Sequence, residues 1–227
     1  MNHHLKKPYS LDEIRSDWKD CLRCPLHLTR TQTVFGSGNS VDPKILVIGQ
    51  SPSEIEDREG KPFIGNVNWH LNAAMEKAGI NREKDCYITN SVICRPWIPH
   101  SRSNFPPSID SIETCRKRLL LEYELIRNTV KVIVLVGKEA YATWMEYDEF
   151  SDPGFTTSRI TLKEVLGWSK TPDTGIDTYT IYPPLHIAKK NSAELALAWL
   201  NDWKAISAFA LNSKRYSPRR QNGQERA

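Results

Sequence analysis

Four short runs of apolar or β-branched residues punctuate the chain and predict the strands of a sheet. The first and third runs have no polar alternation, which fits strands buried on both faces of a parallel sheet. Turn-forming residues follow the first and fourth runs. The four runs span residues 45–48, 87–93, 132–136 and 178–182.

Apolar residues at helical spacing occupy most of the segments between these runs. Leu71 and Met75 fall on one face of a helix over 68–78, and Gly79 follows as its C-cap. Further helices are predicted at 10–20, 112–126, 138–147 and 194–211.

This alternation of strands and helices predicts an α/β fold. We expect a single three-layer α/β/α domain over residues 1–211, with a central, mostly parallel four-stranded sheet. Residues 148–177 show no pattern, and we expect them to be irregular. The sequence shows no internal repeat and gives no persuasive second domain.

The charge of the chain is concentrated at its end. The formal net charge is +4, and residues 212–227 hold five Arg or Lys and one Glu, so this tail accounts for the whole excess. We expect the tail to be disordered. Any affinity of residues 1–211 for nucleic acid must come from local patches of positive charge, because these residues carry almost no net charge.

The sequence also indicates where the protein works. No run approaches about 18 apolar residues, and no secretory signal is visible, so we expect a cytoplasmic protein that does not enter a membrane. In that setting its five cysteines favour metal binding or redox chemistry over disulfides.

Four of the cysteines are spaced as a metal site requires. Cys21 and Cys24 lie two residues apart, Cys94 follows a predicted strand, and Cys115 lies on the next helix. Four thiolates suit zinc or an iron–sulfur cluster, and spacing does not choose between them. The CxxC pair taken by itself fits a redox pair equally well. Cys86, at the edge of a strand, is predicted to be a small core residue.

The stretch that follows the first strand is the leading candidate for a binding loop. Gly49, Gln50 and Ser51 lie at the carboxyl end of that strand, where open α/β sheets bind ligands. An acidic run follows, and then two glycines flank Phe63 in a tight turn that offers backbone N–H groups and one ring. The alternative is an ordinary loop with a surface charge cluster.

Two further side chains belong to the same predicted edge. Asn90 ends the second strand, and its amide is able to read a nucleobase edge as donor and acceptor. A strand-end cap explains it equally well. His186 follows the fourth strand and would face the same crevice. Lys189, Lys190 and the loop containing Arg95 and Arg102 are candidates for phosphate contacts or for a solvated surface.

Together these blocks resemble the iron–sulfur uracil-DNA glycosylases of the family 4 type, over about residues 12–210. The resemblance rests on Gly49 through Gly65, Ile88-Thr89-Asn90, Arg95-Pro96, His186, the Val34-Phe35-Gly36-x-Gly38 segment and the four cysteines. The chain departs from the family pattern at Gln50, where Glu is usual, at Ser53, at Val67-Asn68 and at Ile187-Ala188.

The resemblance implies a uracil-DNA glycosylase that excises uracil from single- or double-stranded DNA, as a monomer. It implies a [4Fe–4S] cluster on Cys21, Cys24, Cys94 and Cys115, with zinc as the alternative. It assigns Phe63 to stacking on uracil and Asn90 to reading its edge. His186 and backbone N–H groups from Gly49 to Ser51 would stabilise the leaving base. Because Gln50 replaces a carboxylate, we expect reduced glycosylase activity. The alternative is a protein that is stabilised by an iron–sulfur cluster and binds uracil-containing DNA with weak or no catalysis.

Overall fold

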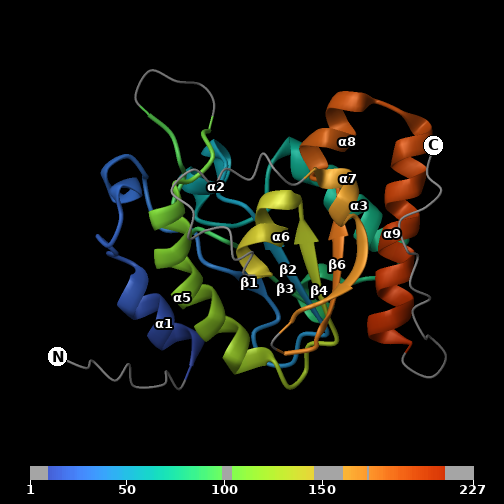
Figure 1. Cartoon of the computed structure of the whole chain (residues 1–227), viewed down its shortest axis with the longest axis horizontal. Helices are drawn as coiled ribbons and strands as arrows, with labels where there is room; N and C mark the ends of the chain where they lie inside the picture. The colour runs from blue at the N-terminus through green and yellow to red at the C-terminus, as the bar shows by residue number, and fades with distance from the viewer. Residues whose placement is uncertain (1–9, 99–103, 146–160, 173, 213–227) are drawn as a thin grey trace.

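The computed structural model describes residues 10–98, 104–145, 161–172 and 174–212 (Figure 1). Within these residues, six strands form one mixed sheet in the order β1-β3-β2-β4-β6-β5. The strands are β1 (Ser37–Gly38), β2 (Ile45–Gly49), β3 (Cys86–Asn90), β4 (Val132–Val136), β5 (Gly167–Lys170) and β6 (Asp177–Ile181).

The four predicted strands are confirmed as the parallel centre of this sheet. Strand β2 lies between β3 and β4, and β6 pairs with the far side of β4, all in parallel. The prediction of a four-stranded sheet is wrong, because β1 and β5 add an antiparallel strand at each edge. These edge strands are short and only partly buried, so neither carries the apolar run that marks a central strand.

Helices cover both faces of the sheet, which confirms the predicted three layers (Figure 1). Side chains alternate along each strand, so Leu46 and Ile48 face one layer of helices and Ile45 and Val47 face the other. The first layer contains α1 (Leu11–Trp18), α5 (Ile109–Ile126) and α6 (Lys138–Trp144). The second contains α3 (Trp69–Lys77), α8 (Pro184–Lys190) and α9 (Ala193–Leu211).

Several short helices complete the described chain. They are η1 (Pro25–Leu28), α2 (Glu54–Glu59), η2 (Asn66–Asn68), α4 (Arg82–Asp85) and α7 (Leu162–Val165). Helix α7 and strand β5 lie in the stretch predicted to be irregular, so that prediction is wrong for residues 162–170. The predicted disordered tail lies outside the described residues except for Asn212. Among the helices described here, none is long and apolar enough to cross a membrane.

Candidate functional site

Three of the predicted site residues meet at the carboxyl end of strand β2. Gly49 is the register partner of Asn90 on the neighbouring strand β3. A Cβ atom added to Gly49 would overlap the side-chain oxygen of Asn90 and would lie 2.5 Å from Cζ of Phe63. The amide and the ring therefore converge on a backbone position that only glycine leaves open.

The amide of Asn90 is buried with part of its hydrogen-bonding capacity unused. The residue is 2% exposed, and its Nδ2 atom has no hydrogen-bond partner among the described residues. A buried donor without a partner is costly, and in a native protein it calls for a specific explanation such as a ligand. The strand-end cap considered above does not account for this free donor.

The loop around Phe63 is held in an uncommon backbone conformation. Phe63 has a φ of 54° and is 6% exposed. Arg82 supports the loop by donating from Nη1 to the carbonyl of Phe63 at 2.9 Å and from Nη2 to the carbonyl of Pro62 at 2.7 Å. The contacts around it stabilise the positive φ and fix the direction of the ring.

A buried carboxylate joins this loop to the loop after β2. The Glu56 carboxylate accepts hydrogen bonds from the backbone N–H groups of Ser53 and Phe63, and Asn68 Nδ2 lies 3.5 Å from it. Burial raises the pKa of Glu56, against the opposing effect of these hydrogen bonds. Glu56 therefore sets the distance between the two loops.

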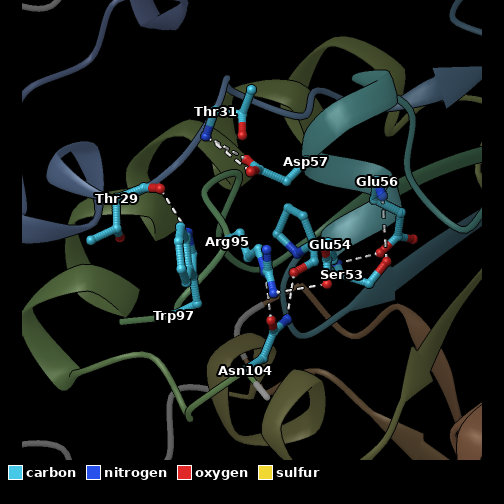
Figure 2. A network of polar contacts seen from close by, with 10 residues as sticks. Thr29, Thr31, Ser53, Glu54, Glu56, Asp57, Arg95, Trp97 and Asn104 are labelled. Carbon is cyan, nitrogen blue, oxygen red and sulfur yellow. Dashed lines mark hydrogen bonds and ion pairs between the residues drawn. The ribbon is translucent and has the colours of Figure 1, made fainter. Parts of the chain in front are cut away.

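Helix α2 was missed in the sequence, although its signal was present. Ser53 and Glu56 form a capping box, and Gly60 ends the helix with a φ of 71°. The alternative of a surface charge cluster is wrong for Glu56 and Asp57, which are 5% and 1% exposed. Asp57 accepts hydrogen bonds from the backbone N–H group of Thr31 (Figure 2) and from that of Gln32, so α2 also anchors the segment after the CxxC pair.

Gln50 and Ser51 extend the β2 edge beyond the strand. Both are partly buried. The N–H of Ser91 donates to the carbonyl of Gly49 at 2.8 Å, and the N–H of Val92 donates to that of Gln50 at 3.1 Å. The backbone at the predicted site is therefore tied to the segment that follows Asn90.

His186 lies on a different element, helix α8. Its ring stacks on Tyr182 with centroids 4.7 Å apart. The carbonyl of Tyr182 accepts a hydrogen bond from Trp199 Nε1 at 3.1 Å. Helix α8 packs against η2 and α3, which directly follow the Phe63 loop. Within the described residues, no hydrogen bond or ring contact joins His186 to Gly49, Phe63 or Asn90.

Arg95, a candidate for phosphate contacts or for a solvated surface, is buried in a network of polar contacts, so the solvated surface is wrong for this residue. Its side chain is 8% exposed and pairs with Glu54 at 3.4 Å, while Nε donates to Asn104 at 2.9 Å (Figure 2). The guanidinium also lies 4.9 Å from the ring centroid of Trp97. Lys189 and Lys190 are exposed, and Arg102 lies outside the described residues.

The four predicted ligand cysteines are buried and close enough to influence one another. Cys21, Cys24, Cys94 and Cys115 are 7%, 9%, 2% and 2% exposed, and all are free thiols. Burial raises the pKa of Cys94 to about 12, and the neighbouring Cys115 and Cys24 add to the effect. Burial also raises the pKa of Cys115, with contributions from Cys24 and Cys21.

Arg30 closes this cysteine group. Its Nη1 donates to the carbonyl of Cys21 at 2.7 Å and to Sγ of Cys94 at 3.1 Å. Among the described side chains, no group of three or more His, Cys, Asp or Glu has a geometry that would hold a metal ion. The residues fit a thiolate-bound metal in type, number and burial, because four neighbouring thiols and one cation suit its charge. Cys86 belongs to the opposite face of the sheet and is 0% exposed, which confirms it as a core residue.

Comparison with known proteins identifies the family of this chain. Residues 35–204 match the Uracil DNA glycosylase superfamily. The chain is 34% identical to the type-4 uracil-DNA glycosylase of Thermotoga maritima over 191 residues, which cover 84% of this chain and 90% of that protein. It is 33% identical to that of Archaeoglobus fulgidus over 199 residues, or 87% and 92% of the two chains. For Sulfurisphaera tokodaii the identity is 31% over 210 residues, or 92% and 88%. The chain therefore belongs to the uracil-DNA glycosylase superfamily and, within it, to the type-4 uracil-DNA glycosylases.

Proposed function

We propose that this protein is a uracil-DNA glycosylase, which hydrolyses the N-glycosidic bond of uracil in DNA and leaves an abasic site for repair. The observation that carries the proposal is the convergence of the Asn90 amide and the Phe63 ring on Gly49. A ring and an unpaired amide, both buried at the end of a parallel strand, are what a pocket for one flipped-out base needs. The family membership of the chain supports the same chemistry.

Recognition of the base follows from the two side chains. The flipped uracil stacks on Phe63, while the Asn90 amide pairs with its Watson–Crick edge as donor and acceptor. Cytosine presents the opposite donor and acceptor pattern at that edge. It would leave buried polar groups unpaired, so the pocket rejects it.

Bond cleavage needs stabilisation of separated charge. The bond between C1′ and N1 breaks, and the electron pair leaves with uracil as an anion. Water adds to C1′ and releases a proton to solvent, which neutralises the uracil anion. His186 donates a hydrogen bond to O2 of the leaving uracil, with help from backbone N–H groups between Gly49 and Ser51. His186 and Asn90 share no hydrogen bond or ring contact here, and we expect the base to bind between them. Gln50 orients the water without accepting its proton.

We also infer that Cys21, Cys24, Cys94 and Cys115 hold a [4Fe–4S] cluster. Four buried, mutually interacting thiols support it, and zinc is the alternative for the same donors. The group supplies no step of the hydrolysis, which is redox-neutral. It ties the segment that contains the CxxC pair to helix α5 and to the loop that follows β3.

The remaining expectations concern the chain as a whole. We propose that residues 1–211 form one domain and that the protein acts as a monomer within the cell. The rival is a protein that binds uracil-containing DNA with little cleavage, and the observation in its favour is Gln50 in place of a carboxylate.

The test is incubation of the cluster-loaded protein with a uracil-containing oligonucleotide, followed by alkali to cut abasic sites. Asn90→Ala and His186→Ala are expected to lose cleavage by at least about 10²-fold. Asn128→Ala, at an exposed position after α5, is expected to cleave like the wild type and serves as the control. Tight binding without cleavage by the wild type would establish the binding protein instead, and neither binding nor cleavage would reject both functions.

A further inference from the structure

Arg118 is an arginine buried in the core next to the proposed base-reading residue. Its side chain is 0% exposed and lies on helix α5, one turn after Cys115. Removing a charge from water is expensive, so a buried arginine persists only where its partners compensate for the lost hydration. The partners of Arg118 fall into two groups, one on each terminal nitrogen of the guanidinium.

Half of the guanidinium joins α5 to strand β3. Nη1 of Arg118 donates to Glu122 at 2.7 Å and to the Thr89 hydroxyl at 3.0 Å. The Thr89 hydroxyl in turn donates to Glu122 at 3.1 Å, and Glu122 is 1% exposed. This closed triangle neutralises the charge and fixes Arg118 in place.

The other half holds the backbone at the end of β3. Nη2 of Arg118 donates to the carbonyl of Asn90 at 2.6 Å and to that of Ser91 at 3.1 Å. The same peptide unit is held from its other side, because the N–H of Ser91 donates to the carbonyl of Gly49 at 2.8 Å. The peptide plane between Asn90 and Ser91 is therefore fixed at both its oxygen and its nitrogen.

The side chains carried by this peptide unit are buried and unsatisfied. Asn90 Nδ2 and Ser91 Oγ both lack a hydrogen-bond partner among the described residues. No hydrogen bond from a described side chain therefore holds the Asn90 amide nitrogen in place. Its orientation depends on the backbone from which it projects, and Arg118 holds that backbone.

We propose that Arg118 is a positioning residue for uracil recognition: it fixes the Asn90–Ser91 peptide plane, and thereby aims the Asn90 amide at the base. Glu122 and Thr89 hold Arg118 for this task. The inference rests on the proposed function, in which Asn90 reads uracil. It predicts that loss of the fork misaims the amide, and a small displacement of a positioned group costs about 10- to 10²-fold.

The informative variant is Arg118→Lys. A lysine ammonium keeps the charge beside Glu122, but it lacks the planar fork that reaches Glu122, Thr89 and two carbonyls at once. The matched control is Arg116→Lys on the same helix. Arg116 donates to the carbonyl of Thr143 at 3.1 Å and so joins α5 to helix α6, away from Asn90.

Binding is measured to an oligonucleotide that contains 2′-fluoro-2′-deoxyuridine, whose fluorine disfavours the sugar cation and so blocks cleavage. Four proteins form a double-mutant cycle: wild type, Arg118→Lys, Asn90→Ala and the double variant. We expect Arg118→Lys to weaken binding about tenfold or more when Asn90 is present. In the Asn90→Ala background we expect a change of less than about twofold, since the amide to be positioned is gone. An equal loss in both backgrounds would show a general structural role and overturn the proposal.

A second readout needs no ligand and keeps the proposal testable if uracil is not bound. Hydrogen exchange of the Ser91 and Val92 amides, which donate to Gly49 and Gln50, reports how firmly this segment is held. We expect faster exchange at these two amides in Arg118→Lys and unchanged exchange in Arg116→Lys. Unchanged exchange in Arg118→Lys would refute the positioning role, whereas failure of wild-type binding alone would refute the proposed function.

If Arg118→Lys does not fold, Arg118→Met combined with Glu122→Gln removes both charges and leaves no unpaired ion. The same loss of binding and the same faster exchange are expected, and wild-type values for both would overturn the proposal.

Discussion

At the scale of single residues, the site depends on the missing side chain of Gly49. Gly49→Ala places a methyl group against Asn90 and Phe63, so either the amide or the ring must move. We expect uracil cleavage to fall by about 10²-fold and the free energy of unfolding to fall by about 1–3 kcal/mol.

Gly79→Ala is the matched control for this substitution. Gly79 has a φ of 76°, so alanine is strained there as well, but nothing lies within 4 Å of the added carbon. We expect it to lose stability by about 1–2 kcal/mol and to keep its rate of cleavage. A Gly49→Ala protein that cleaves at the wild-type rate would show that the convergence at Gly49 does not matter to the reaction.

We propose that Gln50 lowers the catalytic rate of this protein. A carboxylate at this position accepts a proton from water and balances the cationic sugar, which an amide does not do. We therefore expect Gln50→Glu to raise the single-turnover rate of cleavage, by about 10²-fold. Asn128→Asp adds the same charge at an exposed site and should leave the rate unchanged. An unchanged rate in Gln50→Glu would mean that water activation does not depend on this side chain.

At the scale of elements, helix α2 joins the two loops of the site through Glu56. Because burial raises the pKa of Glu56 above its usual 4.5, the folded state keeps this proton at a pH where the unfolded state has lost it. The resulting stability is present below pH 4.5 and is lost as pH rises through the folded pKa.

The expected outcome for Glu56→Gln follows from this sign. The variant does not titrate, and its amide N–H₂ faces backbone donors, so it is less stable than the wild type by about 1–3 kcal/mol. The gap should be widest below pH 4.5 and should narrow as pH rises above it. Urea unfolding across this range measures the gap, with the exposed Glu59→Gln on the same helix as control. A gap that widens with rising pH would contradict the assignment.

Prediction from sequence succeeded for elements whose pattern comes from burial in the centre of the sheet. Strands β2, β3, β4 and β6 were found because each carries apolar or β-branched residues that pack on helices. Strands β1 and β5 were missed because a half-exposed edge strand needs no such run. Helix α2 is too short for a periodic signal, and only its capping box marked it.

The candidate site was predictable in part for the same reason. The register of parallel strands places Gly49 opposite Asn90, so their meeting follows from the strand assignment. The role of Arg118 does not follow from the strand assignment, because the two carbonyl groups that it binds belong to a different element from its own helix. One signal was available: Arg118 and Glu122 lie on the same helical stripe as Cys115 and Leu119, where charges are unexpected. The sequence places His186 after the correct strand, but its position on α8, stacked on Tyr182, depends on packing that the sequence does not show.

At the scale of the whole molecule, the cysteine group connects segments that are far apart in sequence. We expect removal of iron by a chelator to lower Tm by about 10 °C or more and to expose residues 10–35 to proteolysis before the strands. Iron content, thermal unfolding and the order of cleavage sites measure this effect.

Cys94→Ala should lose iron, whereas Cys86→Ala should keep it, because Cys86 lies on the opposite face of the sheet. Full iron content in Cys94→Ala would remove this residue from the ligand set. If the protein binds zinc and not iron, the proposal of an iron–sulfur cluster is wrong, but the structural role of the four cysteines stands.

Helix α9 has a consequence for the protein during its synthesis. Trp199 and Trp203 are 2% and 0% exposed against the sheet, and Trp199 also holds the carbonyl of Tyr182, on whose ring His186 stacks. A nascent chain that has not yet released α9 from the ribosome leaves that face of the sheet open and His186 without its support. The packing of this face and the support of His186, the proposed catalytic histidine, therefore both depend on α9. We therefore expect a chain that stops before α9 to lack glycosylase activity and to be cut readily by proteases.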